Sequence, residues 1–149
     1  MTSPRRAAAE ARRTLARMAR PAGAFDASRY FRGDVELGFY NVGTSRMRAV
    51  AKSIYRAHRN DWSCQDAVSF AEALITDRHL EVKSVGIEVV ALYRRSFTPG
   101  LLRVCKRWLA RGHSSNWATT DAICGCLIGP LTRRRFEFSA SALDAQRGT

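Results

Sequence analysis

A tryptophan and an acid stand four residues apart where a long basic segment ends. The segment 94–120 holds six Lys or Arg residues and no Asp or Glu, so Asp121 is the first acid after it. On a helix, residues i and i+4 share a face, and Trp117 and Asp121 should therefore point the same way. A carboxylate here repels the polyanion that the basic residues attract. A surface that only binds phosphate has no need for such a carboxylate. We therefore expect Asp121 to take part in a reaction.

The overall charge predicts a polyanionic partner. The chain of 149 residues has 25 Lys+Arg against 13 Asp+Glu, a formal net charge of +12. Only Lys52, Lys83 and Lys106 are lysines, and the planar guanidinium of the arginines suits phosphate oxygens. A GC-rich genome would also favour arginine over lysine, but it would not explain the scarcity of acids. The composition therefore favours a nucleic acid as partner.

Length, hydropathy and cysteine usage narrow the class of protein. The chain has the size of one domain, and Glu88 interrupts its most apolar segment, residues 85–93, so no membrane span of ~20 apolar residues is expected. The four cysteines show neither a disulfide framework nor a CxxC pair, and Cys124 and Cys126 form only a CxC. We therefore expect reduced thiols in a cytoplasmic protein and no bound metal.

The hydrophobic pattern predicts a succession of short helices and no strand. The expected helices cover residues 44–58, 63–75, 80–94, 98–112 and 114–128, after an Ala/Arg-rich helix at the N-terminus. Gly86 is expected to be a tolerated weak point within the third of these. Their starts and ends are marked by Thr44-Ser45, a capping box from Ser63 to Asp66, Thr98-Pro99 with Gly112, and Ser114 or Ser115 with Gly129-Pro130.

Helices with one apolar stripe each are typical of antiparallel pairs stacked into a bundle or an α-solenoid. Alternate helices, at 44–58, 80–94 and 114–128, begin about 35 residues apart, near the period of helical repeats. In a solenoid these three would form one wall of the concave face. The alternative interpretation of its charges is an ordinary solvated face. The wall would carry Arg46, Arg48, Lys52, Lys83, Trp117 and Asp121.

Four short segments together carry a resemblance to a known family: YNVGTSRMR at 40–48, RHLEVK at 78–83, YRRSF at 93–97 and NWATTD at 116–121. Over about residues 30–131, the chain is similar to the bacterial DNA alkylation repair glycosylases, which are built of HEAT-like, armadillo-like helical repeats. The resemblance implies removal of N3- and N7-alkylated purines from double-stranded DNA without a metal or an organic cofactor. It also implies a monomer that works in the cytoplasm on the nucleoid, without any membrane.

The resemblance implies roles for individual residues. Asp121 matches the catalytic acid, whose charge stabilises positive charge on the deoxyribose while the N-glycosidic bond breaks. Trp117 matches a tryptophan of the DNA groove, whose π-face attracts a cationic nucleotide more than a neutral one. Thr44 and Ser45 match the place at a helix N-terminus where family members bind phosphate, and Arg48 resembles a basic residue beside that contact.

The C-terminal part departs from the family pattern. Family members continue with further repeats, which supply an arginine and a second tryptophan to the lesion site, whereas residues 132–149 here are divergent and hold no tryptophan. None of Arg133, Arg134 and Arg135 can be matched to that arginine. We therefore expect a helical extension over 1–28, a partial HEAT-like domain over 29–131 whose C-terminal repeats are missing, and a disordered tail over 132–149.

Three functions stay open on the sequence. The first is a DNA glycosylase that hydrolyses the N-glycosidic bond of N3-/N7-alkylated purines, either active or weakened by the missing repeats. The second is a DNA-binding relative without catalysis, and the third is a helical protein-interaction scaffold whose basic surface meets an acidic protein. The dense arginines and the isolated Asp121 favour the first two over the third.

Overall fold

The computed structural model describes residues 2–21, 37–113 and 116–133, and within them the chain is helical. Beyond one isolated bridge between Gly38 and His79, no strand occurs in these segments, which confirms the predicted all-α class. The predicted tail lies outside the described residues from position 134 on. The elements are α1 (Pro4–Arg17), α2 (Thr44–His58), α3 (Cys64–Ile75), α4 (Leu80–Ala91), the 3-10 turn η2 (Arg94–Ser96), α5 (Gly100–Ala110), α6 (Trp117–Ile123) and the π-helical turn η3 (Cys124–Ile128).

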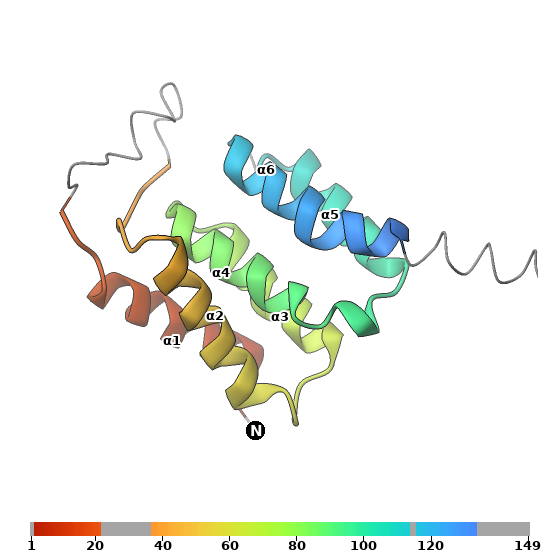
Figure 1. Ribbon diagram of the computed structural model, residues 1–149, viewed down its shortest axis with the longest axis horizontal. Helices are drawn as coiled ribbons and strands as arrows, with labels where there is room; N and C mark the ends of the chain where they lie inside the picture. The colour runs from red at the N-terminus through yellow and green to blue at the C-terminus, as the bar shows by residue number, and fades with distance from the viewer. Residues whose placement is uncertain (1, 22–36, 114–115, 134–149) are drawn as a thin grey trace, which may run out of the picture.

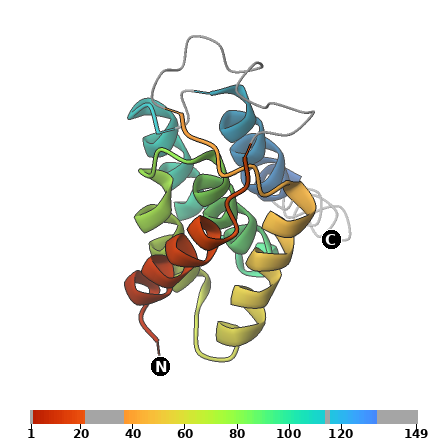
Figure 2. The same cartoon turned by 90° about the vertical axis from the view of Figure 1, so that its left-hand side faces the viewer.

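The helices form two layers (Figure 1). In one layer α4 lies between α2 and α6, and it also packs on η3, while α1 and α3 pack together in the other layer, which α5 continues. Figure 2, turned by 90°, separates α2 and α6 on one side from α1 and α5 on the other. The contact between the layers is most extensive between α3 and α4. Alternate helices therefore share a layer.

The core lies between the layers and is built from the predicted apolar stripes. Phe70, Leu74, Val82 and Val85, from α3 and α4, are fully buried. The predicted capping box starts α3: Ser63 N donates to Asp66 Oδ2 at 2.9 Å and Asp66 N donates to Ser63 Oγ at 3.3 Å. These local signals are confirmed because they depend on neighbours in the chain rather than on the tertiary structure.

The N-terminal helix belongs to the packed layer. Its buried side chains meet α3, and Arg12 reaches across to Asp77 with 3.1 Å between Nε and Oδ2. Helix α1 is therefore part of the core, whereas the predicted domain boundary at residue 28 lies outside the described residues. The buried residues of α1 are Ala7, Ala8, Ala11 and Leu15.

The prediction that Gly129-Pro130 ends the last helix is wrong. The helix passes through η3 and continues to residue 133. Gly129 N donates to Cys124 O in this turn, five residues back, and Thr132 Oγ1 donates to Ile128 O at 2.6 Å. Proline has no N–H to place in the helix, and the widened π turn is a known way for a helix to absorb such an irregularity.

Two further corrections concern helix starts. Helix α6 begins at Trp117 because Asn116 is its N-cap, with Thr119 N donating to Asn116 Oδ1 at 2.8 Å, and not at Ser114 or Ser115. Pro99 precedes α5 without any side-chain cap, although Gly112 ends that helix region with a φ of +75° as predicted.

No helix in the described part of the chain is both long and apolar enough to cross a membrane.

Gly86 is a close-approach residue and not the tolerated weak point that the pattern suggested. A Cβ at this position would lie 3.1 Å from Ala71 Cα and 3.3 Å from Ala71 Cβ. Helices α3 and α4 therefore approach each other at a point where a side chain does not fit.

We expect Gly86→Ala to lower the free energy of unfolding by about 1 kcal/mol. Forcing a methyl group into this contact costs about 1–3 kcal/mol, which exceeds the ~1 kcal/mol that alanine gains over glycine in a helix. Urea unfolding followed by circular dichroism measures the change. The control is Gly125→Ala in η3, where a Cβ would meet no atom within 4 Å, and we expect it to keep or slightly raise stability. A more stable Gly86→Ala variant would refute the close-approach argument.

Candidate nucleic-acid interface

The N-terminus of α2 is held in place by the start of α4. Tyr40 N and Asn41 N donate to the Glu81 carboxylate at 3.0 and 2.9 Å. Two hydrogen bonds of the neighbouring strand-like bridge act in the same way: Gly38 N donates to Arg78 O at 2.8 Å, and Leu80 N donates to Gly38 O at 3.0 Å. The segment that leads into α2 is therefore fixed to α4 before the helix begins. No local pattern predicts this role of Glu81, because its partners lie about 40 residues away in the chain.

A ring stack supports the same segment. Tyr40 and His79 stack with 3.9 Å between ring centroids and 7° between planes, and His79 Nδ1 lies 2.8 Å from Asp77 Oδ1. Burial alone would raise the pKa of Asp77, but hydrogen bonds from His79 and Arg12 outweigh it and hold the pKa below its usual value. Arg12, Asp77, His79 and Tyr40 thus connect α1 to the residues that precede α2.

Helix α2 begins without a side-chain cap. Gly43 occupies the N-cap with a φ of +85°, and Thr44 and Ser45 are the first helical residues. The prediction that Thr44-Ser45 caps the helix is therefore wrong. Both are exposed. The first N–H groups of a helix have no partner within it and lie at the positive end of its dipole, so this terminus can accept an anion.

The predicted basic residues of α2 lie on the surface. Arg46 and Lys52 are exposed, as is Arg48, whose Nε lies 3.4 Å from Glu88 Oε1 on α4. Burial and then the charge of Glu88 raise the pKa of the Cys126 thiol, while Arg48 acts in the opposite direction. The Arg48–Glu88 pair therefore joins α2 to α4, the helix that also packs on η3. No pattern in the sequence predicts this pairing.

Lys83 does not lie on the exposed wall where it was predicted. Its side chain is only 8% exposed, and Nζ donates to Ile75 O at 2.7 Å and to His113 O at 3.0 Å. Lys83 therefore connects α4 to the end of α3 and to the segment after α5, beneath the surface. A direct contact with DNA would require its ammonium group to leave these carbonyls.

Asp121 is exposed on α6, the helix that packs on the far side of α4 from α2. Trp117 is the first residue of that helix, one turn before Asp121, and the position of its side chain lies outside the described structure. Two buried polar atoms near this helix start, Asn116 Nδ2 and Thr119 Oγ1, have no hydrogen-bond partner among the described residues. The structure thus places Asp121 and the start of α2 in the same layer, with α4 between them.

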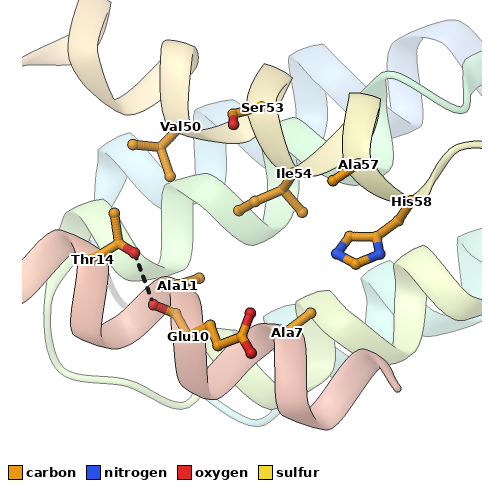
Figure 3. Close-up of a pocket in the computed structure, with 9 residues that line it drawn as sticks. All are labelled: Ala7, Glu10, Ala11, Thr14, Val50, Ser53, Ile54, Ala57 and His58. Atoms are coloured by element: carbon orange, nitrogen blue, oxygen red, sulfur yellow. Dashed lines mark hydrogen bonds between the residues drawn. The ribbon is translucent and has the colours of Figure 1, made fainter. Parts of the chain in front are cut away.

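A different hollow lies between α1 and α2 (Figure 3). It encloses about 230 Å³, and Figure 3 shows Val50 and Ile54 from α2 facing Ala11 from α1, with Glu10 and His58 farther along it. The described residues that line it include neither Lys nor Arg. This hollow therefore lacks the charge that phosphate binding needs, and the candidate interface is the layer of α2, α4 and α6.

Within the described residues, no group of three or more His, Cys, Asp or Glu side chains could hold a metal ion. The chemistry available to the candidate interface is that of one exposed carboxylate, an uncapped helix N-terminus and exposed cations. Such a set can bind a polyanion and stabilise a developing positive charge.

Comparison with known proteins identifies the family. Searches of curated proteins and of solved structures give no match to this chain. The model of the family described as DNA alkylation repair enzyme matches residues 11–144, which include α2 through η3 and the second half of α1. The matched range is wider than the segment on which the sequence resemblance was based. The chain therefore belongs to the DNA alkylation repair enzyme family, and its role lies in DNA repair.

Proposed function

We propose that this protein is a DNA glycosylase that hydrolyses the N-glycosidic bond of N3- and N7-alkylated purines in double-stranded DNA. The observation that carries the proposal is the exposed carboxylate of Asp121 on a helix that follows a purely basic segment, in a chain of the alkylation repair family. A repulsive charge facing DNA is costly for binding alone, and it is useful where positive charge develops on a sugar.

In the proposed reaction, the bond between C1′ of the deoxyribose and N9 of the cationic alkylpurine breaks. Its electron pair goes to the base, which leaves as a neutral molecule, and the sugar becomes oxocarbenium-like. Asp121 stabilises that charge and accepts a proton from the water that adds to C1′. Trp117, one turn earlier on α6, would attract the cationic base through its π-face. No step requires a metal or an organic cofactor.

DNA binding is proposed to use the exposed part of the same layer. The N-terminus of α2 with Thr44 and Ser45 would bind one phosphate, and Arg46, Arg48 and Lys52 would neutralise neighbouring ones. Lys83 is assigned a supporting role, because its ammonium group is occupied by main-chain carbonyls. The alternation of the helices between two layers agrees with an α-solenoid of HEAT-like repeats, which we propose as the architecture.

The proposed binding mode predicts a strong salt dependence. The logarithm of the affinity for an undamaged duplex should fall linearly with the logarithm of salt concentration, with a slope of about −0.9 for each phosphate that is neutralised. Arg46→Ala on α2 should make this slope shallower by about 0.9. Arg13→Ala, which removes an exposed arginine from α1 in the other layer, is the matched control and should leave the slope unchanged. Fluorescence anisotropy of a labelled duplex gives both slopes, and equal effects of the two substitutions would argue against this surface.

Catalysis is tested apart from binding. The wild-type chain should release free N7-methylguanine or N3-methyladenine from an alkylated duplex, detected by chromatography of the released base. A protein that binds the duplex with the expected salt dependence but releases no base would be the non-catalytic relative. A protein that does neither would point to the interaction scaffold.

A further inference from the structure

A second basic region lies in the other layer, away from the candidate interface. A cleft of about 410 Å³ opens where the C-terminal ends of α3 and α5 meet the residues that follow α5. None of its lining residues belongs to α2, α4 or α6. The polar residues that line it are Glu72, Thr76, Arg107, Arg111 and His113.

The cations of this cleft exceed its acids. Arg107 forms an ion pair with Glu72, and Arg111 follows Arg107 by one helical turn and is exposed. Behind the cleft lies the buried ammonium group of Lys83, 3.0 Å from the main-chain oxygen of His113. Asp77, which follows Thr76 of the cleft in the sequence, forms ion pairs with Arg12 and His79. Among the described residues around the cleft, one carboxylate thus opposes three cations.

Several of the main-chain carbonyls that would repel an anion here already accept hydrogen bonds. Helix C-termini carry partial negative charge, and two of them border this cleft. Lys83 Nζ donates to Ile75 O, the last carbonyl of α3, at 2.7 Å. At the end of α5, Arg111 N donates to Arg107 O at 3.0 Å and Gly112 N donates to Leu109 O at 3.4 Å. These hydrogen bonds weaken the repulsion that an anion would meet at the two helix ends, and the side-chain cations attract it.

We propose that this cleft is a phosphate-binding site, in which Arg111 and His113 donate to the phosphate oxygens, the Thr76 hydroxyl adds a third donor, and Lys83 supplies charge from behind. Arg107 completes the positive rim while it stays paired with Glu72. The guanidinium group of Arg111 matches the geometry of two phosphate oxygens. The proposal does not depend on the glycosylase function, because the three donors lie outside α2, α4 and α6 and Lys83, the one contributor from α4, is buried.

The pKa of His113 can be used to detect phosphate binding in the cleft. Burial, followed by the charges of Lys83 and Arg111, lowers the pKa of His113 below its ordinary value. A phosphate bound in the cleft would add negative charge beside the imidazole and favour its protonated form, so the pKa of His113 should rise on binding. A merely structural role of these side chains would not produce a phosphate-dependent pKa.

The test titrates the full-length protein with inorganic phosphate at constant ionic strength and follows the Cε1 proton of His113 by NMR. The resonance is identified by its loss in His113→Gln. We expect a saturable shift and a raised pKa of His113, and we expect Arg111→Gln to weaken phosphate binding by about tenfold, as for loss of a charge-assisted hydrogen bond. Lys106→Gln, which removes an exposed cation of α5 that does not line the cleft, should bind phosphate like the wild type.

Absence of a saturable shift up to tens of millimolar phosphate would overturn the proposal, and so would equal binding by the Arg111→Gln variant and the wild type. A second arm identifies the source of the phosphate. If the site receives the DNA backbone, Arg111→Gln should make the salt slope of duplex binding shallower by about 0.9, and inorganic phosphate should compete. An unchanged slope together with phosphate binding would assign the cleft to a small phosphate ligand. Neither arm depends on Asp121, so failure here leaves the glycosylase proposal standing.

Discussion

Asp121→Asn should reduce the release of N7-methylguanine from an alkylated duplex by at least about 100-fold, the scale expected when a group that stabilises transition-state charge is removed. Asparagine keeps the size of the side chain but offers no negative charge to the developing oxocarbenium ion and cannot accept a proton from water. Because Asp121 is exposed and α6 is capped by Asn116, the substitution should not unfold the helix. Single-turnover release with enzyme in excess isolates the chemical step from product release.

Binding should respond in the opposite direction to catalysis. Removing a carboxylate from a surface that faces phosphates relieves repulsion, so Asp121→Asn should bind the duplex as tightly as the wild type or slightly more tightly. Asp61→Asn is the matched control, because Asp61 is an exposed acid beyond the C-terminal end of α2 and the change in net charge is the same. Equal loss of release in both variants, or full activity of Asp121→Asn, would remove Asp121 from the reaction.

The sequence predicted those parts of the fold that depend on local patterns. The apolar spacing of α2 and α3, the capping box at Ser63 and the helix end at Gly112 all appear in the structure. Each is determined by residues within one or two turns, and a single chain contains that information. The placement of alternate helices in one layer follows from their stripes and short connections.

What the sequence did not predict depends on contacts between distant segments. Gly86 resembled a weak point because the close approach of Ala71 comes from the neighbouring helix. No role was predicted for Glu81, because it accepts hydrogen bonds from residues about 40 positions away in the chain. The helix passes Gly129-Pro130 because the π turn accommodates the proline, which a rule based on residue type does not foresee.

Lys83 is the clearest case of a charge that the pattern misplaced. Its neighbours in the chain, Val82 and Ser84, are buried and half-buried, and the position alone gave no sign that a lysine would turn inward. Inside the protein the ammonium group holds Ile75 O and His113 O, which joins α3, α4 and the segment between α5 and α6. The residue is therefore expected to matter for stability and for the position of α6 rather than for direct contact with DNA.

Lys83→Met should lower the free energy of unfolding by about 2 kcal/mol. Methionine keeps most of the apolar stem but leaves two carbonyl oxygens without their donor, at about 1–3 kcal/mol for each buried acceptor, and relief from burying an ammonium group offsets part of this cost. For a chain of this length the melting temperature should fall by roughly 4–8 °C.

The effect should be greatest near α6. Loss of the bond to His113 O releases the segment that leads into Asn116, so amide hydrogen exchange in α6 should accelerate more than in α2. Lys106→Met on α5, which removes an exposed lysine, is the control and should change the melting temperature little. If Lys83→Met unfolds at the wild-type temperature with unchanged exchange in α6, other donors satisfy the two carbonyls and the proposed supporting role of Lys83 is wrong.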